Sequence, residues 1–334
     1  MNWFYRLSVV ATVLCLVVVV LGAYVRLSDA GLGCPDWPGC YGHLTVPRAE
    51  EHIARAEARF PERPVDVGKA WLEMIHRYAA STLGLLLVAS AVISLRHRGS
   101  SMPTKLPWVL LVAVLLQGTL GMWTVTWLLK PAVVTAHLLG GMTILALLFL
   151  QTLSTRRAVR SASPGVKPPP HVSPGLRRFG LIALVVLALQ IFLGGWTSTN
   201  YAAFGCPDFP TCNGAYWPPE TDFRSGFKIW HGIGEDFEGG LLSQDARAAI
   251  HYVHRLGAIV TTLLLGFLAL RLWRKARLPV HAAALAAALV LQVLIGIGIV
   301  ELQLPLGLAT AHNLGAALLL LAVVAANHRL WRSA

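Results

Sequence analysis

Four histidines stand near the start of four hydrophobic stretches, where ionisable side chains are costly and usually functional. They are His76, His137, His254 and His312. The sequences around them match in pairs, "IHRYAASTLGLLL" with "VHRLGAIVTTLLL" and "TAHLLGG" with "TAHNLGA". Imidazoles serve as axial ligands of haem iron, whereas a zinc site would need further His or Cys ligands at the same level. The pattern predicts two bis-histidine haem sites.

A carboxylate accompanies only one of these sites. Glu73 precedes His76 by three residues, while His251 precedes His254 by three. Residues three apart share a helix face, so Glu73 is expected to face whatever His76 binds. It is either a proton acceptor or cation stabiliser beside a cofactor, or an interfacial residue that caps a span. His251 is an alternative ligand to His254, and we prefer His254 because His-Arg then matches His-Arg.

Arginines next to the histidines are candidates for pairing with haem propionates. Arg77 follows His76, Arg255 follows His254, and Arg26 at the end of the first span is a weaker candidate. A lipid-facing or helix-stabilising role is the alternative for each. Several glycines recur at matching places, and ordinary helix packing explains them as well as a cofactor contact does. They are Gly22, Gly118, Gly121, Gly140, Gly141, Gly194, Gly195, Gly296, Gly298 and Gly315.

Four of the five cysteines form two closely spaced pairs in long polar loops. Cys34 and Cys40 enclose "PDWPG", and Cys206 and Cys212 enclose "PDFPT". An oxidising exterior permits one disulfide in each loop, and Pro and Gly suit a tight turn between the partners. These disulfides are either structural or redox-active. Cys15, in an apolar run, is expected to pack in the core or against lipid.

The composition is that of a polytopic membrane protein, because 334 residues with 55% hydrophobic and 13% charged residues cannot cover a soluble surface. A span needs about 20 apolar residues. Eight segments meet this requirement, at 6–26, 70–95, 106–128, 132–153, 178–198, 248–271, 279–300 and 305–327. Helix rise places all four histidines roughly 9–10 Å below the outer ends of their spans.

The second half of the chain repeats the first at an offset of 172 to 178 residues. Each repeat contains four spans, so both have the same orientation. We therefore predict an all-α membrane fold of two tandem pseudo-symmetric four-helix bundles. Residues 1–155 form the first bundle and 178–334 the second. A flexible cytoplasmic linker, 156–177, rich in Pro, Ser and basic residues, joins them.

The distribution of charge predicts the orientation. Basic residues collect in the short loops and at both termini, so these lie in the cytoplasm, and the cysteine-containing loops lie on the periplasmic side of the inner membrane. The net charge of +12 is explained by this anchoring against anionic lipid. Nucleic-acid binding is excluded, since the basic residues are split among short membrane loops.

Seven motifs in this order resemble the haem A synthase family over nearly the whole chain. They are "GLGCPDWPGC", "ExxHR" beginning at Glu73, "QGTLGMWTV", "TAHLLGG", "GCPDFPTC", "VHR" and "ATAHNLGA". The family oxidises the C8 methyl group of haem O to the formyl group of haem A. The resemblance implies a substrate site for haem O at His76 and His137. It also implies a haem b cofactor at His254 and His312, and catalysis by Glu73.

The same resemblance implies partners in the lipid bilayer. Haem O synthase would hand over the substrate, and a membrane carrier such as a quinone would exchange electrons. A homo-oligomer is a further expectation. The main alternative is a quinol-linked dihaem b cytochrome that leaves its haems unmodified. A quinone-linked disulfide-forming protein and a transporter explain the four histidines less well. The charged loop 232–247 is expected to shield the second site or to contact a partner.

Overall fold

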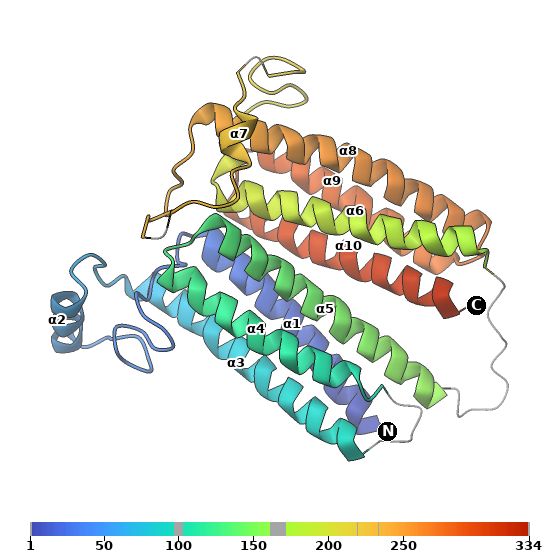
Figure 1. The fold of residues 1–334 in the computed structure, drawn as a ribbon, viewed down its shortest axis with the longest axis horizontal. Coiled ribbons are helices and arrows are strands. Elements are labelled where there is room, and N and C mark those ends of the chain that lie inside the picture. The colour runs from blue at the N-terminus through green and yellow to red at the C-terminus, as the bar shows by residue number, and fades with distance from the viewer. Residues whose placement is uncertain (1, 97–102, 161–171, 219, 233, 333–334) are drawn as a thin grey trace.

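The structure is a computed structural model. The long helices that the sequence predicts make up most of its fold (Figure 1). The structure describes residues 2–96, 103–160, 172–218, 220–232 and 234–332. Within these ranges there are helices and turns but no strand, apart from isolated bridges that join Cys40 to His43 and Cys212 to Ala215.

Among the described residues, eight helices are long and apolar enough to cross a membrane, which confirms the predicted number of candidate spans. They are α1 (Asn2–Leu27), α3 (Val67–Arg96), α4 (Leu106–Thr126), α5 (Pro131–Arg160), α6 (Pro174–Thr199), α8 (Gln244–Arg274), α9 (Pro279–Glu301) and α10 (Leu306–Arg332). The chain is thus a multi-pass membrane protein. Three short helices lie in the loops, α2 (Glu50–Arg59), η1 (Ala202–Phe204) and α7 (Phe223–Gly226).

Most of the helices extend a few residues beyond the predicted spans. Helix α5 continues to Arg160, and α6 begins at Pro174, where the Ser173 side chain accepts a hydrogen bond from the Leu176 N–H. Hydropathy reports the apolar length of a helix, whereas capping residues and proline decide where it begins and ends. Both ends of the predicted linker 156–177 are therefore helical, and residues 161–171 of that linker lie outside the described residues.

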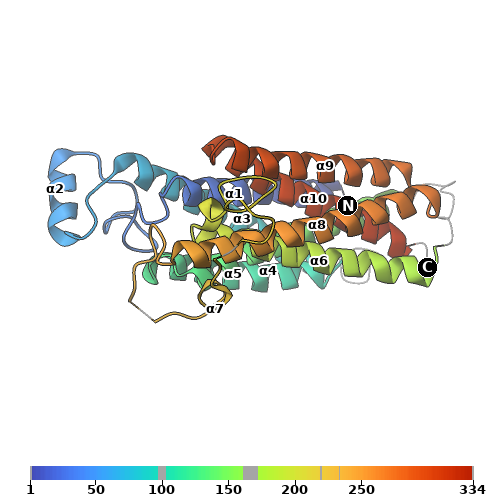
Figure 2. The ribbon, with the colours of Figure 1, turned by 90° about the horizontal axis from the view of Figure 1, so that it is seen from above.

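The helices pack in two groups of four. Helices α1, α3, α4 and α5 contact one another in a ring, as do α6, α8, α9 and α10. The groups join through contacts of α1 with α10, α5 with α6 and α5 with α10. Helices α4 and α9 have the least buried surface of the eight, so they lie on the outside of their groups (Figure 2).

The long loops gather at one end of the helices, which we call the loop end, and α2 projects beyond it (Figures 1 and 2). Residues 234–240, here called the strap, belong to the second half of the chain but lie against the first. The Phe237 N–H donates to the Leu128 carbonyl at 3.1 Å, and the Phe237 ring is buried beside Val125. Arg63 pairs with Asp236 and, at 2.5 Å, with Glu238.

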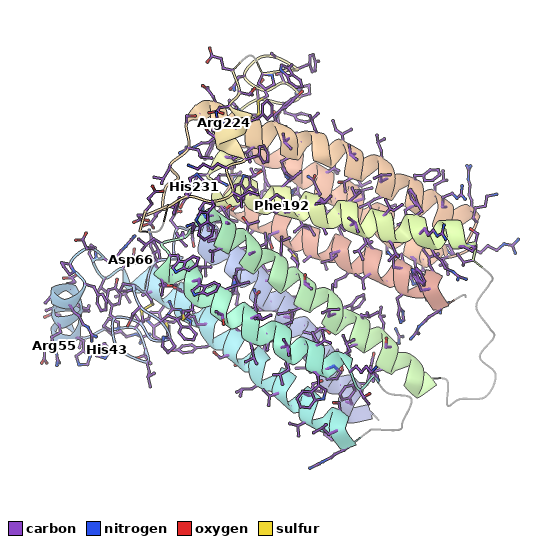
Figure 3. All side chains as sticks on the ribbon, in the orientation of Figure 1. His43, Arg55, Asp66, Phe192, Arg224 and His231 are labelled. Carbon is purple, nitrogen blue, oxygen red and sulfur yellow. A yellow bond between two sulfur atoms is a disulfide. The ribbon has the colours of Figure 1, made fainter. Side chains whose placement is uncertain are left out.

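A buried lysine holds the segment that precedes the strap. Lys130 is 1% exposed, donates to the Gly232 carbonyl at 3.1 Å and lies 3.6 Å from the ring centroid of Trp230. His231, labelled in Figure 3, meets the Phe237 ring edge-on at 5.7 Å between ring centroids. The strap therefore contacts the first half of the chain at the loop end. That loop 232–247 shields the second site or contacts a partner stays a prediction.

Candidate functional site

Each of the four histidines points its ring at a glycine on a neighbouring helix. A methyl group added at Gly22 on α1 would lie 2.9 Å from Cε1 of His76 on α3. The equivalent distance from Gly194 on α6 to Cε1 of His254 on α8 is 3.2 Å. Heavy atoms do not approach this closely without one of them moving, so glycine is what admits each ring.

The other two histidines repeat this arrangement. A methyl group at Gly121 on α4 would lie 3.1 Å from Cε1 of His137 on α5, and one at Gly296 on α9 would lie 3.0 Å from Cε1 of His312 on α10. We call Gly22, Gly121, Gly194 and Gly296 the slot glycines. The sequence marked them only as recurring glycines.

The slots bring the histidines together in the predicted pairs. His76 lies within electrostatic range of His137, and His254 within that of His312. Among the described residues no three His, Cys, Asp or Glu side chains converge as a metal site. Among the described residues, no hydrogen-bond partner is found for the buried Nδ1 atoms of His76, His137 and His312. Imidazoles paired in this way fit axial ligation of haem.

Glu73 is buried at the loop end of α3, with 4% of its surface exposed. Its Oε1 accepts a hydrogen bond from Arg77 at 2.6 Å, and its Oε2 accepts one from the Cys34 N–H at 2.8 Å. The carboxylate therefore connects the helix that carries His76 to the first disulfide loop.

His251 occupies the equivalent place in the second group. Its Nδ1 accepts a hydrogen bond from the Cys206 N–H at 3.2 Å, and its Nε2 lies 3.3 Å from Nε of Arg255. Glu73 and His251 thus have equivalent neighbours, but the carboxylate accepts from both of them and a neutral imidazole from only one. Since the imidazole of His251 holds the second disulfide loop, holding a disulfide loop does not by itself require the carboxylate of Glu73.

The candidate propionate partners contact protein groups. Arg77 donates to the carbonyls of Asp36, at 3.0 Å, and of Gly39. Arg255 donates to the carbonyls of Cys206 and Thr211, each at 2.7 Å. These arginines fix the disulfide loops against the helices, and propionate binding stays a prediction.

Arg26 joins the two halves of the chain. It donates to the Ser198 carbonyl at 3.0 Å and lies 4.2 Å from the ring centroid of Tyr201. Tyr201 in turn donates to Asp29 at 3.0 Å. The guanidinium therefore helps to hold the loop ends of α1 and α6 together, and its predicted propionate contact is also untested.

Both disulfides are present, Cys34–Cys40 with a Cα–Cα distance of 4.7 Å and Cys206–Cys212 with 4.6 Å. All four cysteines are at most 1% exposed. Thiol–disulfide exchange needs access to a sulfur atom, so this burial favours structural disulfides. Cys15 is free and buried on α1, as expected.

The slot geometry predicts the effect of a single methyl group. Gly121→Ala would push the His137 ring aside and lower haem affinity about 10–100-fold, as is usual when support of a metal ligand is lost. Gly118→Ala, one turn away on α4, is the matched control, because a methyl group there meets nothing within 4 Å. The haem-to-protein ratio after purification measures both. Equal ratios in the two variants would contradict the slot interpretation.

The chain is similar to known proteins over nearly its whole length. A family model for COX15-CtaA, described as cytochrome oxidase assembly protein, matches residues 5–324. A protein of Shewanella oneidensis called "Heme A synthase" is 45% identical over 332 residues, which cover 99% of this chain and 97% of that protein.

More distant relatives carry the same name. A "Heme A synthase" of Caulobacter sp. strain K31 is 30% identical, with 93% of this chain and 91% of the relative covered. One of Caulobacter vibrioides is 28% identical, with 90% and 88% covered. Because the match extends over nearly all of the sequence that carries the paired histidines, the chain belongs to the COX15-CtaA family.

Proposed function

We propose that this protein is a haem A synthase, an oxidoreductase that converts the C8 methyl group of haem O into the formyl group of haem A. The name of its relatives supports this activity. The observation that carries the proposal is the unequal pair of histidine sites. Both have two imidazoles on slot glycines, but only the site of His76 has a carboxylate three residues earlier, at Glu73.

The difference between the two sites supports an assignment of the two haems. Haem O would bind as substrate between His76 and His137 in the first bundle, residues 1–155. A resident haem b would be held by His254 and His312 in the second bundle, residues 178–334, beyond the linker 156–177. When bound, haem b would supply one-electron transfer. The matching ring contacts in α1 to α5 and α6 to α10 support two pseudo-symmetric bundles.

The protein residues of the first site have defined tasks in this proposal. His76 and His137 bind the substrate iron and orient the macrocycle. Glu73, on the same helix face as His76, accepts a proton released at C8 or stabilises positive charge that develops there. Arg77 positions that carboxylate through its 2.6 Å hydrogen bond. Arg26, Arg77 and Arg255 stay candidates for propionate binding.

The orientation in the membrane completes the proposal. Basic residues at the ends of α3, α8 and α10 opposite the loop end support cytoplasmic termini, by the positive-inside rule. The two disulfides support a periplasmic loop end in the bacterial inner membrane. Transfer of haem O from haem O synthase, electron exchange with a quinone and homo-oligomerisation stay predictions.

Haem extraction tests the function. Acid–acetone extracts of the purified protein are expected to contain haem b together with haem O, haem A or a hydroxylated intermediate, identified by chromatography and mass. Haem b alone, even after expression with a haem O supply, would contradict the proposal and favour a dihaem cytochrome.

A further inference from the structure

A glutamine stands four residues before three of the four slot glycines. Gln117 precedes Gly121, Gln190 precedes Gly194 and Gln292 precedes Gly296. Residues four apart share a helix face, so each glutamine points at the same neighbouring helix as the slot glycine after it. That neighbouring helix is the one that carries the histidine.

Two of the glutamines bond the histidine residue itself. Gln117 donates through Nε2 to the backbone carbonyl of His137 at 2.6 Å. Gln190 donates through Nε2 to the backbone carbonyl of His254 at 3.0 Å, and this nitrogen lies 3.1 Å from Nδ1 of the ring. The amide thus ties the backbone of the ligand to the helix that forms its slot.

A second glycine, three residues after the histidine, makes room for the amide. Methyl groups added at Gly140, Gly257 and Gly315 would collide with Oε1 of Gln117, Gln190 and Gln292, respectively. All three oxygen atoms are buried. His137, His254 and His312 therefore share one device, a glutamine packed over a glycine, which we call the amide clamp.

His76 departs from this device at both positions. The residue four before its slot glycine is Val18, and the residue three after it is Ala79. Valine has no side-chain donor for the His76 carbonyl, and alanine carries the methyl group that an amide clamp excludes. The slot at Gly22 remains, with 2.9 Å from the added methyl position to Cε1 of His76. His76 consequently has the slot but not the amide clamp.

We propose that the amide clamps make His137, His254 and His312 permanent iron ligands, and that His76 is the exchangeable ligand through which haem enters and leaves. The proposal rests on the assignment of haem O to the first site. A substrate site must release its iron in every catalytic cycle, whereas a cofactor site must not. Two clamped ligands suit a resident haem. One clamped and one unclamped ligand suit a haem that turns over.

Carbon monoxide binding to the dithionite-reduced protein tests this proposal, because CO takes the place of a ligand that dissociates. In the wild type, one haem is expected to bind CO and the other to stay six-coordinate. The double variant Val18→Gln/Ala79→Gly builds the missing clamp on His76 and should slow CO binding at least tenfold. Unchanged CO binding in this variant, with both haems retained, would overturn the proposal.

The converse variant keeps the test decisive if the first does not fold. Gln190→Val/Gly257→Ala gives His254 the residues found beside His76, and the second haem should then bind CO and pass to apomyoglobin faster. A second haem that stays inert in this variant contradicts the proposal. CO binding reports ligand lability whichever haems are bound, while extraction reports the function, so the two ideas can fail separately.

Discussion

Glu73→His is expected to abolish haem A formation while the protein keeps its fold and both haems. Histidine is the residue that the second half uses at the equivalent place, where His251 accepts the Cys206 N–H and lies beside Arg255. The replacement can therefore hold the Cys34 N–H as Glu73 does at 2.8 Å. Only the carboxylate chemistry is lost, which should lower the rate about 10²–10⁴-fold.

The measurement is the haem A to haem O ratio in extracts, together with total haem and the thermal stability of the purified variant. His251→Glu is the matched control, since it places the first-half residue in the second half and should leave haem content unchanged. Product formation near the wild-type rate in Glu73→His would show that Glu73 only holds the loop. Loss of both haems would show that a histidine cannot replace its structural contacts.

The second large effect is expected from His312→Gly, which should remove haem b and leave haem O in place. The ring of His312 lies against Gly296, and His312 is one of the two ligands that we propose for the second site. Its removal leaves one axial position without a protein ligand. Extraction should then show haem O with little haem b, and conversion to haem A should stop because electrons can no longer leave the site.

Added imidazole provides the control for this variant. It fits the space that the deleted side chain leaves, so it should restore haem b binding and its low-spin spectrum, which a misfolded variant would not regain. His137→Gly is the counterpart and should lose haem O instead. If His312→Gly lost haem O and kept haem b, the assignment of substrate and cofactor to the two bundles would be reversed.

The eight spans, the duplication, the histidine pairs and the contrast of Glu73 with His251 could all be read from the sequence. Hydropathy is summed over neighbouring residues, so a span is visible without knowledge of its contacts. The duplication is likewise visible in the amino-acid sequence without any knowledge of the structure. The helix ends show the limit of hydropathy, because the Ser173 cap and Pro174, the first residue of α6, decide where that helix begins.

Only the tertiary structure decided which glycines admit an imidazole and which do not. Gly118 and Gly121 lie on the same helix, yet only Gly121 faces His137, because the rotation of α4 is set by its packing against α5. The same holds for the strap, where Arg63 reaches Glu238 across the two halves. Such contacts join residues far apart in the chain, and helix rotation and loop paths, which no local pattern encodes, bring them together.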